Sequence, residues 1–192
     1  MNISWMEPKY IFAVIVLVML ISIPIGIYLE RRKKKSLALR NQFGAEYDHA
    51  VIVHGSEEKA EAKLIDRAAR VESLKIHLLA PTERARFLAE WEMVQSRFID
   101  HPKGAVIEAD ELINTVLLAR GYPASTFEQR AADLSVNHPL LMQNYRSAHG
   151  IVVRPGPVLA TTEELRAAMI HYRGIFDELV QAQVPIERNP AA

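Results

Sequence analysis

The stretch from Tyr10 to Leu29 constrains the fold more than any other part of this chain, because it carries no charged residue. As a helix, its twenty residues would be roughly 30 Å long, which is the thickness of the hydrocarbon core of a bilayer. Aromatic residues lie near both ends of the stretch, as they do at membrane interfaces: Trp5, Tyr10 and Tyr28. We therefore expect a single transmembrane helix over residues 10–29.

Two other interpretations of this stretch are weaker. A cleaved signal peptide has a shorter apolar core and ends at small residues, whereas this stretch ends in Ile27-Tyr28-Leu29-Glu30. A buried core helix seldom lacks charge over such a length and then meets five consecutive bases. Pro24 falls near the C-terminal end, where a mild kink is tolerated in a membrane helix.

The charges that flank the apolar stretch predict its orientation. Five consecutive bases follow it: Arg31, Arg32, Lys33, Lys34 and Lys35. Because the more basic side of a membrane helix stays in the cytoplasm, we expect the N-terminus outside a bacterial inner membrane and the C-terminal part in the cytoplasm. The same bases could also bind anionic lipid headgroups. Of the two roles, setting the topology is the simpler and is favoured.

The rest of the chain is long enough for one domain with a hydrophobic core. We expect a short exterior tail over residues 1–9, a basic juxtamembrane segment over 30–40, a cytoplasmic helical domain over 41–182 and a flexible tail over 183–192. No linker rich in Gly, Ser or Pro divides residues 41–180. The chain has no cysteine, which excludes disulfides, thiol nucleophiles and thiolate metal sites.

The charge of the chain is unevenly distributed. Residues 1–40 contain seven bases and two acids, while residues 41–192 contain sixteen bases and twenty-one acids. Nucleic-acid binding needs a cationic surface, so the acidic balance of the larger part argues against a nucleic-acid partner. It leaves the lipid bilayer and another protein as the expected partners.

Apolar residues recur at helical spacing through this domain, and the fold class predicted is all-α, with about six helices after the transmembrane helix. Capping and stop signals predict the helix ends, such as Ser56 before an acidic first turn and the Thr161/Glu164 capping box. Lys75–Leu79 is expected to be an extended linker and Asp133–Pro139 irregular. The helices are expected at 37–54, 57–74, 81–98, 102–120, 140–150 and 162–180, and residues 126–131 could form a further short helix.

One helix carries the strongest aromatic face of the chain, formed by Phe87, Trp91, Val94 and Phe98 at helical spacing. Such a face can stack on a ligand, but it is far more often part of a core. We therefore predict one core that contains Trp91, Phe98, Ile113, Tyr172 and Phe176.

No motif in the sequence predicts catalysis. The chain lacks GxSxG, HExxH, GxGxxG and the phosphate-binding GxxxxGK[ST]. Glu46 and His49 have the Glu-x-x-His spacing of half a di-iron site, but a second such pair is missing. We therefore expect no catalytic residue, no metal and no cofactor.

The densest polar segment is Phe127–Pro139, and its candidate site residues are Arg130, Asp133, Asn137 and His138. In the functional interpretation this polar corner is an active-site loop. In the structural interpretation, which we favour, Arg130 binds carbonyls or a carboxylate, or pairs with Asp133 one turn away, and Asp133 or Asn137 caps the next helix.

Several segments together resemble a family of uncharacterised bacterial proteins that have an N-terminal anchor and one helical domain. The resemblance covers roughly residues 43–180, although Ala80 stands where a serine cap is expected before Pro81. It implies the same architecture, but no activity and no functional residue. The segments are Phe43–Asp48, Trp91–Pro102, Arg120–Pro123, Phe127–Pro139, Tyr145–His149 and Ala160–Leu179.

Two functional classes follow from the sequence. The first is a membrane-tethered helical interaction or scaffold domain without catalytic residues. The second is a small-molecule-binding domain or enzyme that uses the polar corner over residues 127–139. A deep polar pocket at that corner, holding a bound ligand, would favour the second class, whereas a packed corner with an exposed apolar patch elsewhere would favour the first.

Overall fold

A computed structural model describes residues 8–154 and 160–181 of the chain, without the side chains of residues 8–11, 13 and 14. The described part is all-α, as predicted, with eight α-helices, one short 3₁₀ helix and no strand. It divides into two compact units, residues 1–42 and residues 43–192. The elements are α1 (Pro8–Phe43), α2 (Ala45–His54), α3 (Glu57–Ser73), α4 (Pro81–Arg97), α5 (Pro102–Ala119), α6 (Phe127–Asn137), η1 (Pro139–Leu141), α7 (Met142–Val152) and α8 (Thr162–Gln181).

The first unit consists of helix α1, which joins the predicted span and the basic segment into one continuous helix with Pro24 inside it. Within the part of the chain that the structure describes, no helix is both long and apolar enough to cross a membrane. The side chains of four residues of the predicted span (10, 11, 13 and 14) lie outside the described part of the chain, as do all side chains of the predicted tails over 1–9 and 183–192.

The single helix predicted over residues 37–54 is wrong, because the chain breaks at Gly44. Gly44 has φ 51° and ψ −127°, backbone angles that a residue with a Cβ atom adopts only with strain. The helix restarts as α2, with Tyr47 N–H donating to the Gly44 carbonyl over 3.0 Å. Gly55 then ends α2 with φ 77°, and the Ser56 hydroxyl accepts a hydrogen bond from Lys59 N–H, as expected of a cap.

The second unit has seven α-helices within the described residues, rather than about six. The additional helix is α6, which continues through Asn137 where a short helix and then an irregular segment were expected. The effect of Pro139 on the backbone before it is confined to His138, and Leu134 and Val136 are buried on the intact helix. The capping box at Thr161 and Glu164 is present, with Glu164 N–H donating to the Thr161 hydroxyl over 3.2 Å.

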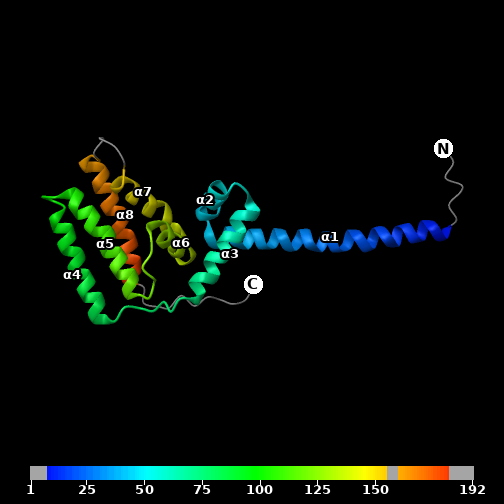
Figure 1. Ribbon diagram of the computed structural model, residues 1–192, viewed down its shortest axis with the longest axis horizontal. Helices are drawn as coiled ribbons and strands as arrows, with labels where there is room; N and C mark the ends of the chain where they lie inside the picture. The colour runs from blue at the N-terminus through cyan, green and yellow to red at the C-terminus, as the bar shows by residue number, and fades with distance from the viewer. Residues whose placement is uncertain (1–7, 155–159, 182–192) are drawn as a thin grey trace. The chain divides into compact units, whose positions relative to one another are not determined.

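The main core lies between α4, α5, α6, α7 and α8. Figure 1 shows α5 beside α4 and α8, and both α5 and α7 pack on α8. Trp91, Ile113, Tyr172 and Phe176 are buried in this core, as predicted, and Phe98 packs against it from a partly exposed position. The aromatic face of α4 is therefore a core face.

Helices α2 and α3 form a hairpin with buried apolar residues of its own, among them Tyr47, Ala60 and Leu64. The hairpin contacts the main core through two pairs of helices, since α3 packs on α6 and α2 packs on α7. Polar side chains dominate this junction, and the candidate site lies there.

Candidate functional site

Arg130 points from α6 into the protein and binds a carboxylate, one of the partners predicted for it. Its Nε–H donates to the Tyr145 hydroxyl over 2.7 Å, and Nη2 binds Asp110 of α5 over 3.0 Å. Both charged side chains are mostly buried, with 11% and 18% of their surface exposed. This pair connects α5, α6 and α7 around one tyrosine.

Tyr145 stays protonated in this cluster. Burial, followed by the charge of Asp110, raises the pKa of its phenol above the ordinary value. The hydroxyl therefore accepts from Arg130 and remains a donor toward Asp110, whose Oδ1 lies 3.5 Å away. Because every charged group of the cluster has a partner, we assign it to holding the helices together.

Asp133 belongs to a different cluster, so the predicted local pair with Arg130 is wrong, as is the predicted cap. Its carboxylate accepts from Nε–H of Arg70 on α3 over 3.1 Å and from Gln129 Nε2 over 2.7 Å. Only 2% of the side chain is exposed. Asp133 thus connects the hairpin to α6.

The last two residues of the polar corner also face protein groups. Asn137 Nδ2 donates to the Tyr122 hydroxyl over 3.4 Å. His138 Nδ1 lies 3.4 Å from Glu178 Oε1 of α8, and its Nε2 is buried without a hydrogen-bond partner in the described part of the chain. The structure therefore does not bring Arg130, Asp133, Asn137 and His138 together around one open site.

Glu46, the acid of the Glu-x-x-His pattern, also forms a salt bridge. Its carboxylate is bound by Arg146 of α7, with Nη2 at 2.6 Å and Nε at 3.4 Å. Burial and the neighbouring charge of Arg146 lower the pKa of His49. Glu46 therefore links α2 to α7 through this salt bridge.

Arg67 of α3 lies near two salt bridges, Asp133–Arg70 and Glu46–Arg146. It is the residue that sequence analysis missed. The carboxylates of Glu46 and Asp133 act on its charge from a distance, but it makes no hydrogen bond and no ion pair with any described residue. Its Nη1 is buried, and burial lowers the pKa of the guanidinium, which an arginine tolerates without losing its proton at neutral pH. A signal was present, because Arg67 follows Leu64 by three residues on the apolar side of α3.

These residues form one charge layer at the junction of the hairpin and the main core, with three guanidinium groups and two carboxylates. Arg146 binds Glu46 and Arg70 binds Asp133. Both carboxylates act on the charge of Arg67, which has no contact partner in the described part of the chain.

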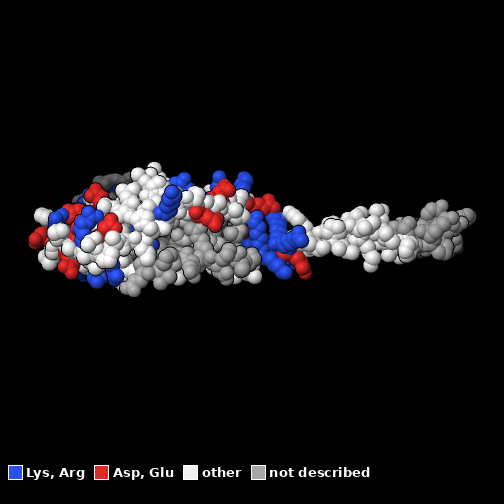
Figure 2. Space-filling view, turned by 90° about the horizontal axis from the view of Figure 1, so that it is seen from below, with Lys and Arg blue, Asp and Glu red and all other residues white. Residues whose placement is uncertain are grey.

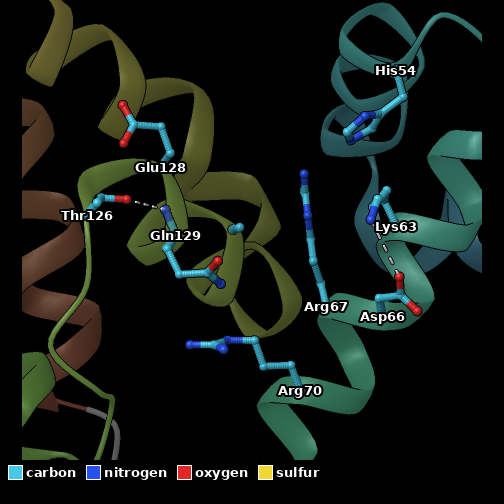
Figure 3. A pocket seen from close by; sticks show the side chains of 9 residues that line it. His54, Lys63, Asp66, Arg67, Arg70, Thr126, Glu128 and Gln129 are labelled. Carbon is cyan, nitrogen blue, oxygen red and sulfur yellow. Dashed lines mark hydrogen bonds and ion pairs between the residues drawn. The ribbon is translucent and has the colours of Figure 1, made fainter.

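A cavity of about 360 Å³ opens beside Arg67, between the hairpin and α6. Figure 3 shows the Arg67 side chain extending from α3 into this space, and Arg70 reaching across toward α6. Nε2 of His54, at the end of α2, is also buried without a partner among the described residues. The lining residues are His54, Lys63, Asp66, Arg67, Arg70, Thr126, Glu128, Gln129 and Ala132.

The two acids that line the cavity do not neutralise Arg67. Asp66 pairs with Lys63 instead, with Oδ2 and Nζ 3.9 Å apart, and both side chains are exposed. Glu128 points away from Arg67 in Figure 3, and hydrogen bonds to its own backbone N–H and to Thr126 lower its pKa. The lining therefore carries three basic side chains, Lys63, Arg67 and Arg70, against two acids, and Arg67 is the base among them that has no partner in the described part of the chain.

A second cavity of about 380 Å³ lies between α2 and α7, on the other side of the Glu46–Arg146 salt bridge. Its charged groups are Glu46, Asp48 and Arg146, and Glu46 and Arg146 bind each other. It offers no unpaired charge comparable with Arg67.

Comparisons of this chain with protein-family models, with curated proteins and with solved structures found no match. The resemblance to a bacterial family stays a prediction, and function has to be inferred from the chain's own geometry and chemistry.

Proposed function

We propose that this protein is a membrane-tethered helical binding domain, with its N-terminus outside a bacterial inner membrane and the second unit in the cytoplasm. The observation that carries the proposal is the surface of α1. From Ile15 to Leu29 every residue is exposed and uncharged, and twelve of the fifteen are large hydrophobic residues. Water does not favour an apolar surface of this size, so a hydrocarbon environment is its natural cover.

The charge pattern of the same helix supports the direction of insertion. Arg31 to Lys35 follow the apolar surface directly, and Figure 2 shows their cluster of positive charge at the end of the uncharged part of α1. Five adjacent bases strongly favour the cytoplasmic side. Their position at the headgroup level also gives them anionic lipid as a partner.

The polar corner supports a binding or scaffold role over catalysis. Catalytic groups need free access to a substrate, whereas Arg130 and Asp133 are both mostly buried and bound by side chains of other helices. The alternative of an enzyme at residues 127–139 is therefore the weaker proposal.

Membrane extraction tests the anchor. The full chain, expressed in a bacterium, should remain in the membrane fraction after alkaline carbonate washing. Leu17→Lys combined with Ile21→Lys should release it, whereas Ile99→Lys, at a residue 83% exposed in the second unit, should not. Complete release of the wild-type chain by carbonate would refute the anchor.

Protease protection tests the orientation separately. In spheroplasts, added protease should leave residues 41–192 intact, and in inverted vesicles it should digest them. Digestion in intact spheroplasts would place the second unit outside the cell and refute the proposed topology.

A further inference from the structure

We propose that the cavity between α3 and α6 binds a phosphate group, with Arg67 as its main ligand. The proposal concerns the second unit alone and does not depend on whether α1 enters a membrane. Its starting point is the charge layer, in which Arg67 is the one guanidinium that has no contact partner among the described residues.

A cation that is buried without a partner raises the free energy of the folded protein. Taking a charged group out of water is expensive unless a counter-charge or hydrogen bonds replace its hydration. Arg70 and Arg146 have such partners in Asp133 and Glu46, while Arg67 has none in the described part of the chain. An anion in the cavity would supply the missing charge and bring the layer to balance.

The donors around the cavity favour phosphate over a single carboxylate. Arg67 offers a planar fork suited to two oxygens of one phosphate. His54 Nε2 and Lys63 line the same cavity from α2 and from the middle of α3. Helix α6 begins at this cavity with Thr126, and helix N-termini attract anions. Donors from three directions match the three terminal oxygens of a phosphate monoester.

The volume limits the size of the ligand. About 360 Å³ admits a phosphate with a small organic group, but no large cofactor. The phosphate could belong to a soluble phosphorylated metabolite or to a lipid headgroup, which present the same chemistry.

The test uses the full chain in detergent micelles, titrated with inorganic phosphate at constant ionic strength. Isothermal titration calorimetry should show saturable binding, and the melting temperature should rise with phosphate. Acetate at the same concentration should bind at least tenfold more weakly. No saturable binding of phosphate at tens of millimolar, or equal binding of acetate, would overturn the proposal.

Arg67→Gln removes the charge while keeping much of the side chain's length. It should weaken phosphate binding at least tenfold, and without phosphate it should melt no lower than wild type, because the unpaired cation is gone. Arg173→Gln is the matched control, since Arg173 lies on α8 with an exposed side chain bound only by Asp177 of the same helix. Equal phosphate affinity in the two variants would overturn the assignment of Arg67.

A second pair of variants covers the case in which Arg67→Gln does not fold. Lys63→Gln, at an exposed residue that lines the cavity, should weaken phosphate binding severalfold. Arg67→Lys should weaken phosphate binding more than Lys63→Gln does, because a lysine lacks the planar guanidinium that binds two phosphate oxygens at once. Wild-type phosphate affinity in both would refute the site.

The source of the phosphate is identified by reconstitution of the chain into lipid nanodiscs. If a lipid headgroup is the ligand, discs containing phosphatidate should weaken the binding of inorganic phosphate, compared with discs of phosphatidylcholine alone. If a soluble metabolite is the ligand, the two kinds of disc should bind inorganic phosphate equally.

Discussion

The indole ring of Trp91 in α4 stacks on the ring of Phe176 in α8, with centroids 4.6 Å apart and planes 16° apart. Both rings are buried in the main core. Offset stacking of this kind adds to the stability that burial of the rings provides. The pair fixes α4 against α8, two helices that are far apart in the sequence.

Trp91→Ala should therefore lower the free energy of unfolding by about 3–5 kcal/mol, through lost burial and the cavity left behind. Urea unfolding followed by circular dichroism measures it. Ile99→Ala is the control, because Ile99 is 83% exposed and its loss should change stability by less than about 0.5 kcal/mol. Wild-type stability in Trp91→Ala would show that the stacked pair carries no energy.

The second prediction concerns which charged residues are coupled. Arg130→Ala should destabilise the domain by about 1–3 kcal/mol, because it leaves Asp110 and the Tyr145 hydroxyl without their donor. Asp133→Ala should cost a similar amount, because Arg70 and Gln129 lose their acceptor.

Double-mutant cycles separate the two clusters. Arg130→Ala combined with Asp110→Ala should be clearly non-additive, since the two residues share one ion pair. Arg130→Ala combined with Asp133→Ala should be close to additive, since they share no partner. A larger coupling energy for the second cycle than for the first would contradict the two-cluster arrangement.

These partners show where sequence reasoning ends. The core positions and most helix ends were predictable, because helical periodicity and capping depend on residues three or four apart. The partner of Asp133 is Arg70, sixty-three positions away, and that of Glu46 is Arg146, a hundred positions away. Local spacing suggested Arg130 as the partner of Asp133. The packing of α3 on α6 instead brings Arg70 to Asp133, and this packing cannot be read from local spacing.

The length of α6 was misjudged for a related reason. The pre-proline restriction on His138 is local, and burial of Leu134 and Val136 keeps the preceding turn helical. Gly44 was equally hard to interpret, because a glycine within a helical pattern often stays helical. Arg67 was predictable as part of a helix, but its missing partner depends on three other helices and could be found only in the structure.

The third prediction concerns Gly121, at the end of α5. Gly121 has φ 92°, and a Cβ there would lie 2.5 Å from the backbone carbonyl oxygen of Lys75. The close approach arises because His77 N–H donates to the Arg120 carbonyl over 3.0 Å, which brings the linker after α3 onto the end of α5.

Gly121→Ala should therefore destabilise by more than about 1 kcal/mol, since it combines backbone strain with a steric clash. Gly55→Ala separates the two causes: Gly55 has φ 77° but open space around its Cβ position, so its substitution should cost less. Thermal unfolding of both variants measures the difference. A greater loss in Gly55→Ala than in Gly121→Ala would show that the contact with Lys75 is unimportant.

The fourth prediction concerns His138, whose ring is buried between α6 and α8. Burial lowers its pKa below 6.5, Glu178 acts in the opposite direction, and the charge of Arg120 lowers it again. The distance of 3.4 Å to Glu178 suits a neutral ring that donates from Nδ1. Nε2 is then a buried acceptor without a partner, which costs less than a buried unpaired N–H of a charged ring.

The sign of the pH dependence follows from the lowered pKa. Below pH 6.5 the unfolded chain takes up a proton at His138 that the folded chain does not, so stability should fall as the pH decreases from 6.5 toward the pKa of the folded state. One such group contributes a slope of at most about 1.4 kcal/mol per pH unit. His49 and His149, whose pKa values are also lowered by burial, contribute slopes of the same sign.

Substitution of His138 isolates its share of the slope. Urea unfolding from pH 5.5 to 7.5 should show a smaller loss of stability toward acid pH in His138→Gln than in wild type. The same substitution at His101, which is exposed at the start of α5, controls for the loss of an imidazole as such. If His138→Gln keeps the full wild-type slope, His138 titrates alike in the folded and unfolded chain, and the attraction of Glu178 cancels the effect of burial on its pKa.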